Sequence, residues 1–194
     1  RIRMGSIEPI QIDDEFKELI NEPFMAKHLH IALQHTSKEM LQIMNRRNKV
    51  LSDLELFEFL SSNGYALGTD FIVGHPGETQ ELWNEAMKNL HNFPLTHIHA
   101  FTYSKRDGTP SASMKDIVKG DIAKDRYIEL VEIIKQKNYE FRQNIKNNKV
   151  KLEVLVEQEK NGKYLGFDQF FNQVEISSNE DLVSDWLNLE DYKV

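Results

Sequence analysis

Cysteine is absent from the 194-residue sequence, and this absence limits the chemistry open to its own side chains. Without thiols the chain forms no disulfide bond and offers no thiolate to a metal ion. Basic residues are in the minority as well, because 24 lysines and arginines face 31 aspartates and glutamates, which gives a formal net charge of -7. A generally basic surface for nucleic acid is therefore excluded, and any RNA contact must come from a local patch.

The sequence also lacks an apolar run long enough to cross a bilayer and a basic-then-apolar signal segment at its start. We therefore expect a cytoplasmic protein without a membrane partner. Residues 1–9 already alternate polar and apolar side chains, as a half-buried strand does, and no initiator methionine precedes them. We expect the chain to be the later part of a longer protein.

Residues 69–79 form the stretch around which the chain is organised, and they read TDFIVGHPGET. An apolar run that stops at Gly74, Pro76 and Gly77 predicts a buried strand that turns sharply into a helix. At such a turn in a parallel sheet the strand ends face the ligand crevice, and glycine lets the backbone approach a ligand closely. An ordinary strand-to-helix turn is the alternative. Glu78 is interpreted as a general base or, more simply, as a favourable charge at the helix start.

Strand patterns alternate with helix patterns over most of the chain. Strands are expected at 1–9, 28–34, 65–73 and 96–103, and helices at 37–47, 52–63, 79–91 and 121–146. A further helix is expected within residues 10–21, with Asp13 and Asp14 at its start. This alternation predicts an α/β fold with a parallel sheet, wound either open or into a barrel. After residue 148 the pattern changes to strict alternation and a hairpin turn, which predicts a small antiparallel β module. We therefore expect two units, residues 1–148 and residues 149–194.

Two kinds of side chain near the expected strand ends could carry chemistry. Gln34 ends one strand and Arg46 ends the helix after it, so that one pocket could receive an amide and a guanidinium suited to ribose hydroxyls and a carboxylate. A solvent-facing arginine is the alternative. The pairs His28/His30 and His97/His99 each put two imidazoles on one face of a strand, as zinc-dependent barrel hydrolases do, with Asp70 as the one plausible carboxylate. Core or surface histidines are the simpler interpretation.

Basic residues gather in two places that could contact RNA. Lys105 and Arg106 form a basic tip on a loop after a strand, which suits phosphate, although a merely solvated loop has the same composition. In the β module, Lys163 stands among aromatic residues such as Tyr164 and Phe167, a mixture suited to single-stranded RNA. Aromatic residues in a small β fold also form its core, and the acidic tail after Glu175 works against RNA.

Several stretches carry a family resemblance together. They are RIRMGSIEP at 1–9, HIALQHTS at 30–37, MNR at 44–46, TDFIVGHPGET at 69–79 and FTYSKRDGTP at 101–110. In this order and spacing they resemble the radical S-adenosylmethionine (SAM) methylthiotransferases. The Ser-Ile-Glu-Pro and Tyr-Ser-Lys-Arg forms are most similar to the branch that thiomethylates threonylcarbamoyladenosine in tRNA.

The resemblance implies the C-terminal part of a radical SAM partial (β/α)6 barrel, with about four β/α units, followed by a TRAM-like β module. It also implies SAM as cofactor and two 4Fe–4S clusters in the full-length enzyme. The cysteine ligands of those clusters are absent from this chain, which should therefore be inactive alone. On this resemblance we expect no stoichiometric zinc and no other metal ligand in the chain.

The resemblance also implies roles for individual residues. Gln34 and Arg46 would hold the polar parts of SAM, and Ile72 would flank the adenine. Asp70 occupies the first glycine position of the family's Gly-x-Ile-x-Gly-x-x-Glu motif, and Gly74 stays in place, so both are expected at the cofactor.

Further residues are expected around the same barrel mouth and on the RNA-facing surfaces. The resemblance places Ser6 beside the cofactor and Glu8 beside the substrate, and it gives Lys105, Arg106 and Lys163 to substrate binding. The expected substrate is tRNA, at the adenosine next to the anticodon in the anticodon stem-loop. Isopentenyladenosine in tRNA and a ribosomal protein are the alternatives within the family, while a zinc-dependent hydrolase and a non-enzymatic RNA-binding protein are alternatives outside it.

Overall fold

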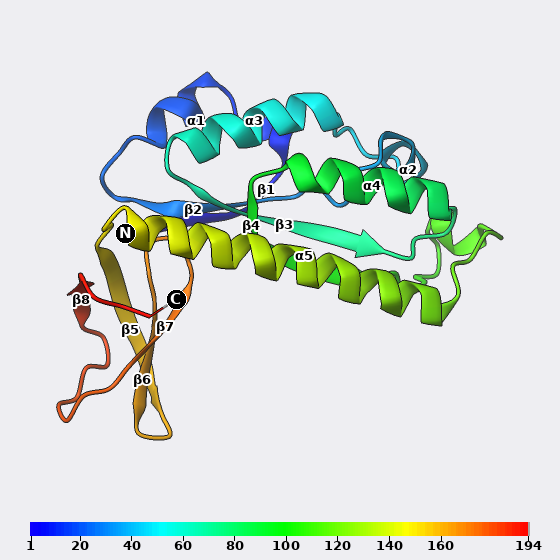
Figure 1. Ribbon diagram of the computed structural model, residues 1–194. Coiled ribbons are helices and arrows are strands. Elements are labelled where there is room, and N and C mark those ends of the chain that lie inside the picture. The colour runs from blue at the N-terminus through cyan, green and yellow to red at the C-terminus, as the bar shows by residue number, and fades with distance from the viewer. Residues whose placement is uncertain (194) are drawn as a thin grey trace.

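A four-stranded parallel sheet forms the larger part of the protein in the computed structural model, which describes residues 1–193. Its strands are hydrogen-bonded to each other in chain order. Figure 1 labels them beneath helices α1, α3 and α4. They are β1 (Ile2–Ile7), β2 (Met25–Ile31), β3 (Ala66–Val73) and β4 (Leu95–Thr102). The predicted α/β fold with a parallel sheet is confirmed.

Helices cover one face of this sheet. They are α1 (Asp14–Leu19), α2 (Lys38–Ile43), α3 (Val50–Ser62), α4 (Gln80–Asn92) and α5 (Gly120–Asn147), with short 3-10 turns at Pro9–Gln11 and Pro110–Ser113. Alternate strand residues such as Leu29, Leu67 and Phe71 are fully buried against Trp83 of α4 and Leu130 of α5. Because side chains alternate along a strand, the residues between them point to the opposite face.

A second sheet, antiparallel and also four-stranded, follows the C-terminal end of α5 (Figure 1). It consists of β5 (Leu152–Lys160), β6 (Lys163–Phe167), β7 (Gln173–Ile176) and β8 (Trp186–Leu189), in the order β7-β6-β5-β8. The predicted hairpin turn is present, with φ of 56° at Asn161 and 76° at Gly162, which suits a tight two-residue turn. Strand β8 was not predicted, because it is short and lies in the acidic tail.

One predicted helix start is confirmed, and one predicted helix end was wrong. The helix expected to start at Asp13 and Asp14 is α1, and Asp13 caps its start by accepting a hydrogen bond from the Phe16 amide (2.9 Å). The helix expected at 37–47 ends already at Ile43, since Asn45 adopts a left-handed φ of 54°. Arg46 therefore stands in the turn after the helix rather than at its end.

The strand expected at 28–34 is also shifted, because β2 ends at Ile31 and Gln34 is left-handed, with a φ of 66°. Strands β3 and β4 and helices α4 and α5 lie within a few residues of their predicted positions. Within residues 1–193, no helix is both long enough and apolar enough to cross a membrane. Val194, the last residue of the predicted second unit, lies outside the described residues.

Candidate functional site

The face of the parallel sheet opposite the helices carries polar side chains, which we call the inner face. Both predicted histidine pairs lie on it, on β2 and β4, with Gly68 and Asp70 of β3 between them. Gly68 makes room for the rings, because a Cβ there would lie 2.9 Å from His30 Nδ1 and 3.3 Å from His28 Nε2. The sequence therefore builds this face around a glycine on the central strand.

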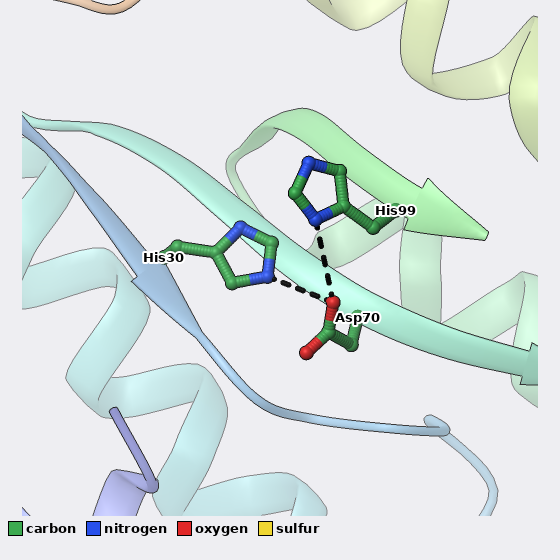
Figure 2. Close-up of side chains that lie close together, drawn as sticks. All are labelled: His30, Asp70 and His99. Carbon is green, nitrogen blue, oxygen red and sulfur yellow. Dashed lines mark hydrogen bonds and ion pairs between the residues drawn. The ribbon is translucent and has the colours of Figure 1, made fainter. Parts of the chain in front are cut away.

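Three of these side chains converge, one from each of three neighbouring strands (Figure 2). Asp70 stands beside His99 in the β3–β4 register, and His30 stands beside Gly68. Asp70 Oδ1 lies 3.0 Å from His30 Nε2 and 3.5 Å from His99 Nδ1. His30 is buried whereas the His99 side chain is 63% exposed, so the cluster opens to solvent on one side.

The other two histidines of the pairs lie beside the second sheet. The rings of His28 and His97 meet edge to face with centroids 4.9 Å apart, and Phe171 lies 5.1 Å from the His28 ring. Arg3 of β1 covers the Phe171 ring at 3.8 Å. Burial lowers the pKa of His28 to about 2 and that of His97 to about 4, so both imidazoles are neutral at physiological pH. These two side chains pack against an aromatic residue rather than joining the cluster.

A pocket of about 620 Å³ opens beside the cluster, at the C-terminal ends of the strands. It brings together five predicted site residues, namely Gln34, Arg46, Asp70, Ile72 and Arg106. Tyr103 and Thr109 from the loop after β4 complete part of its wall. The polar groups include an amide, a carboxylate and two guanidinium groups, which suits a ligand with hydroxyl, amino and carboxylate groups.

Backbone geometry fixes Gln34 and Arg46 at this pocket. The Gln34 amide donates to Asp70 O, and the Ile72 amide donates to Gln34 O, both at 2.9 Å, so the left-handed residue is held against β3. The Arg46 amide donates to Leu41 O at 2.8 Å, which closes the turn after α2. The Arg46 guanidinium lies 3.4 Å from Glu8 Oε1. The predicted substrate residue Glu8 thus contacts a residue of this pocket and itself lines a neighbouring one.

The remaining predicted site residues lie elsewhere. Ser6 is exposed on β1, with a φ of 58° at a register shift between β1 and β2. Lys105 is exposed on the loop after β4, next to Arg106. Gly74 follows β3 with a φ of 76°, and a Cβ there would lie 2.8 Å from Ala123 Cβ of α5. Lys163 lies in the second sheet, where it pairs with Glu175.

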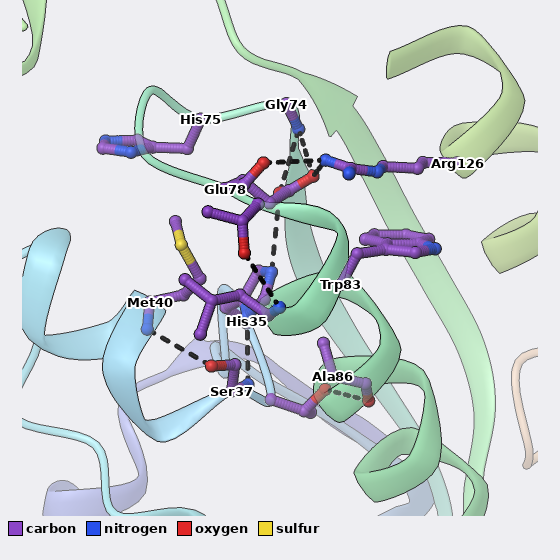
Figure 3. Close-up of polar contacts among 12 residues, drawn as sticks. His35, Ser37, Met40, Gly74, His75, Glu78, Trp83, Ala86 and Arg126 are labelled. Carbon is purple, nitrogen blue, oxygen red and sulfur yellow. Dashed lines mark hydrogen bonds and ion pairs between the residues drawn. The ribbon is translucent and has the colours of Figure 1, made fainter. Parts of the chain in front are cut away.

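The side chain of Glu78, for which the sequence left two roles open, is fully buried. Figure 3 shows it among Gly74, His35 and Arg126. Its carboxylate accepts hydrogen bonds from the Gly74 amide at 3.1 Å and from the Arg126 guanidinium at 2.6 Å. His35 Nε2 lies 3.5 Å from Glu78 Oε2, the oxygen that also accepts from the Gly74 amide, and burial lowers the His35 pKa. Glu78 therefore holds the strand-to-helix turn, and Arg126, a partner 48 residues away, gave no local sequence signal.

Comparison with known proteins points to one family along the whole chain. A Helicobacter pylori (strain J99) protein with the provisional name methylthiotransferase is 49% identical over 194 residues, which is 100% of this chain and 46% of that protein. The threonylcarbamoyladenosine tRNA methylthiotransferase MtaB of Bacillus subtilis is 31% identical over 94% of this chain and 42% of its own length.

A third relative acts on a protein according to its name. The ribosomal protein uS12 methylthiotransferase RimO of Caldanaerobacter subterraneus is 35% identical over 85% of this chain and 38% of its own length. No protein-family model matches the chain. The chain spans about half the length of the curated relatives it matches.

Solved structures show the same fold at low sequence identity. Coproporphyrinogen III oxidase (HemN) from Escherichia coli, described as a radical SAM enzyme, superposes with a TM-score of 0.60 at 16% identity. The match covers 91% of this chain and 46% of that chain. The parallel sheet is thus the radical SAM fold, and the sequence matches over 94% to 100% of this chain show that it belongs to the methylthiotransferase family.

Proposed function

We propose that this chain is the part of a tRNA methylthiotransferase that holds SAM and contributes to tRNA binding. The reaction is addition of a methylthio group to C2 of N6-threonylcarbamoyladenosine at position 37 of tRNA, by radical SAM chemistry. The observation that carries the proposal is the pocket that joins Gln34, Arg46, Asp70 and Ile72 in a chain related along its length to methylthiotransferases.

The pocket residues fit SAM in both size and charge. A volume of about 620 Å³ suits a small cofactor. The Arg46 guanidinium would bind the methionyl carboxylate, and the Gln34 amide would bind ribose hydroxyls. Asp70 supplies an acceptor for hydroxyl or amino groups, and Ile72 supplies apolar contact for the adenine. When bound, SAM supplies both the radical source and the methyl donor.

Iron–sulfur clusters do not fit this chain, because their ligands are thiolates and the sequence has no cysteine. The two 4Fe–4S clusters of the proposed enzyme would be held outside these residues. The role of this chain is to bind and orient the cofactor, which the pocket holds. The loop after β4 lines the same pocket through Arg106.

Contacts with tRNA are proposed at the basic positions of the two units. Arg106 lines the pocket and Lys105 stands exposed next to it, a placement suited to phosphates beside the target nucleotide. Lys163 on the exposed hairpin would contact the anticodon stem-loop farther away. We retain residues 1–148 and 149–194 as the proposed barrel and TRAM-like units, with a cytoplasmic location.

Mass spectrometry of tRNA nucleosides from cells with and without the intact gene tests the proposal. The expected result is loss of the methylthio group from threonylcarbamoyladenosine alone. Loss from isopentenyladenosine instead would assign the protein to that branch. If both nucleosides are unchanged and ribosomal protein uS12 loses a methylthio group, the tRNA proposal is wrong and the relationship to RimO gives the function.

A further inference from the structure

The side chains of His30, Asp70 and His99 form a cluster beside the proposed SAM pocket. SAM binding does not by itself explain the geometry of this cluster. Two imidazole nitrogens approach the same carboxylate oxygen, at 3.0 and 3.5 Å, from strands on either side of it. One ligand atom from each of the three side chains lies within 4.8 Å of the others. No other group of this kind occurs among residues 1–193.

These separations match those of atoms that share a metal ion. Nitrogen and oxygen ligands lie about 2.0 to 2.2 Å from zinc, so two ligands of a tetrahedral ion stand about 3.3 Å apart. Two histidines and one carboxylate are also the set that holds iron(II) with open coordination positions. The His99 side chain is 63% exposed and its ring lies against the His30 ring, with centroids 4.6 Å apart, so binding of an ion would call for adjustment chiefly at His99.

The surroundings favour a preformed ligand set. His30 is only 5% exposed, so neighbouring side chains hold its ring in place. Gly68 leaves space for this ring, since any larger residue would place a Cβ 2.9 Å from its Nδ1. The three side chains stand on adjacent strands of one sheet, which makes the site more rigid than a site on loops.

We propose that His30, Asp70 and His99 bind one divalent first-row transition ion of the zinc and iron(II) class. The family resemblance alone predicts no such ion, and the geometry of the inner face is the reason to depart from that expectation. Because Asp70 also lines the pocket and His99 is open to solvent, the remaining coordination positions would face a molecule bound there. The ion would orient a polar group of the substrate or cofactor. This role rests on the proposed function, whereas binding of the ion does not.

Titration of the chain with Co²⁺, followed by its visible absorbance and by displacement with Zn²⁺, tests the site directly. Since the chain has no cysteine, thiolates make no contribution to the signal. We expect one ion per chain, with Zn²⁺ displacing Co²⁺. His99→Ala and Asp70→Asn should each weaken binding at least about tenfold. The His99 side chain is exposed, so its removal leaves the core intact.

His91→Ala is the matched control, because it removes another exposed histidine, at the end of α4 and away from the cluster. Its Co²⁺ affinity should equal that of the unaltered chain. Equal affinity in the His99→Ala and His91→Ala variants would overturn the proposal and leave the cluster as a hydrogen-bonded group. Arg46→Ala should leave Co²⁺ affinity unchanged. The proposed metal site and the proposed SAM pocket can therefore be tested, and refuted, independently.

Discussion

The two faces of the parallel sheet are built from the same strands and differ in burial and in polarity. On the helix-covered face, Leu67, Phe71 and Val73 are fully buried, and they pack with residues of α3, α4 and α5. On the inner face, Asp70 and His99 remain partly open, and the neighbouring positions carry histidine or glycine. Phe71 and Asp70 are sequence neighbours, yet they belong to different environments.

This difference separates stability from chemistry along each strand. Burial of apolar side chains on one face supplies the folding free energy, so the opposite face is free to carry groups that a core would exclude. The link between the faces is the turn after β3, where buried Glu78 holds the Gly74 amide. Substitutions on the helix-covered face, on the inner face and at this turn should therefore change the free energy of unfolding by different amounts.

A large loss of stability is expected for Glu78→Ala, which removes the carboxylate that holds this turn. The Arg126 side chain is only 6% exposed and would lose its 2.6 Å partner, leaving a buried charge unpaired. Removing one partner of such a pair costs about 3 to 5 kcal/mol in free energy of unfolding. Urea denaturation measures the loss, and Glu81→Ala, which alters an exposed carboxylate in the first turn of α4, should cost much less. A Glu78→Ala variant as stable as Glu81→Ala would show that the turn does not depend on this pair.

Phe71 on the helix-covered face and His99 on the inner face give the clearest comparison of the two faces. Phe71→Ala leaves a cavity beside Trp83 and His35 and should lower the free energy of unfolding by about 3 to 5 kcal/mol. His99→Ala on the inner face should stay within about 0.5 kcal/mol of the original value, because its side chain is exposed. Similar losses in the two variants would contradict the division between the faces.

Gly68→Ala tests how closely the inner face is packed, with a smaller expected effect. The added methyl group would lie 2.9 Å from the His30 ring and 3.3 Å from His97 Cβ, so the histidines must move at a cost of about 1 to 3 kcal/mol. Gly120→Ala, at the start of α5, has nothing within 4 Å and should be neutral or slightly stabilising. Thermal unfolding of both variants measures the contrast. A Gly68→Ala variant no less stable than Gly120→Ala would mean that the rings are not tightly placed.

Local signals in the sequence predicted the elements of this fold well. The glycine-proline-glycine turn and the Asn161-Gly162 hairpin both depend on neighbouring residues. The end of α2 was predicted too late, because a left-handed asparagine is tolerated in many contexts. Strand β8 was missed because its place beside β5 is decided by packing rather than by its own pattern.

Only part of the candidate site could be predicted from the sequence, because its assembly also depends on contacts between distant segments. The sequence indicated Gln34, Arg46, Asp70 and Ile72 through the family resemblance, and the structure brings them to one pocket. Which histidine of each pair meets Asp70 depends on the register of β2 and β4 against β3, which the sequence of a single strand does not contain. The burial of Glu78 depends in the same way on contact with α5.

The most direct test of the central claim, that the pocket at the strand ends serves methylthio transfer, compares two neighbouring arginines in living cells. Cells that lack the gene are given the original gene, an Arg46→Ala variant or an Arg47→Ala variant, and their tRNA nucleosides are measured by mass spectrometry. Arg46 lines the pocket, whereas Arg47 is exposed outside it. The account predicts that the original gene and Arg47→Ala restore methylthiolated threonylcarbamoyladenosine and that Arg46→Ala does not. Full restoration by Arg46→Ala would contradict the claim.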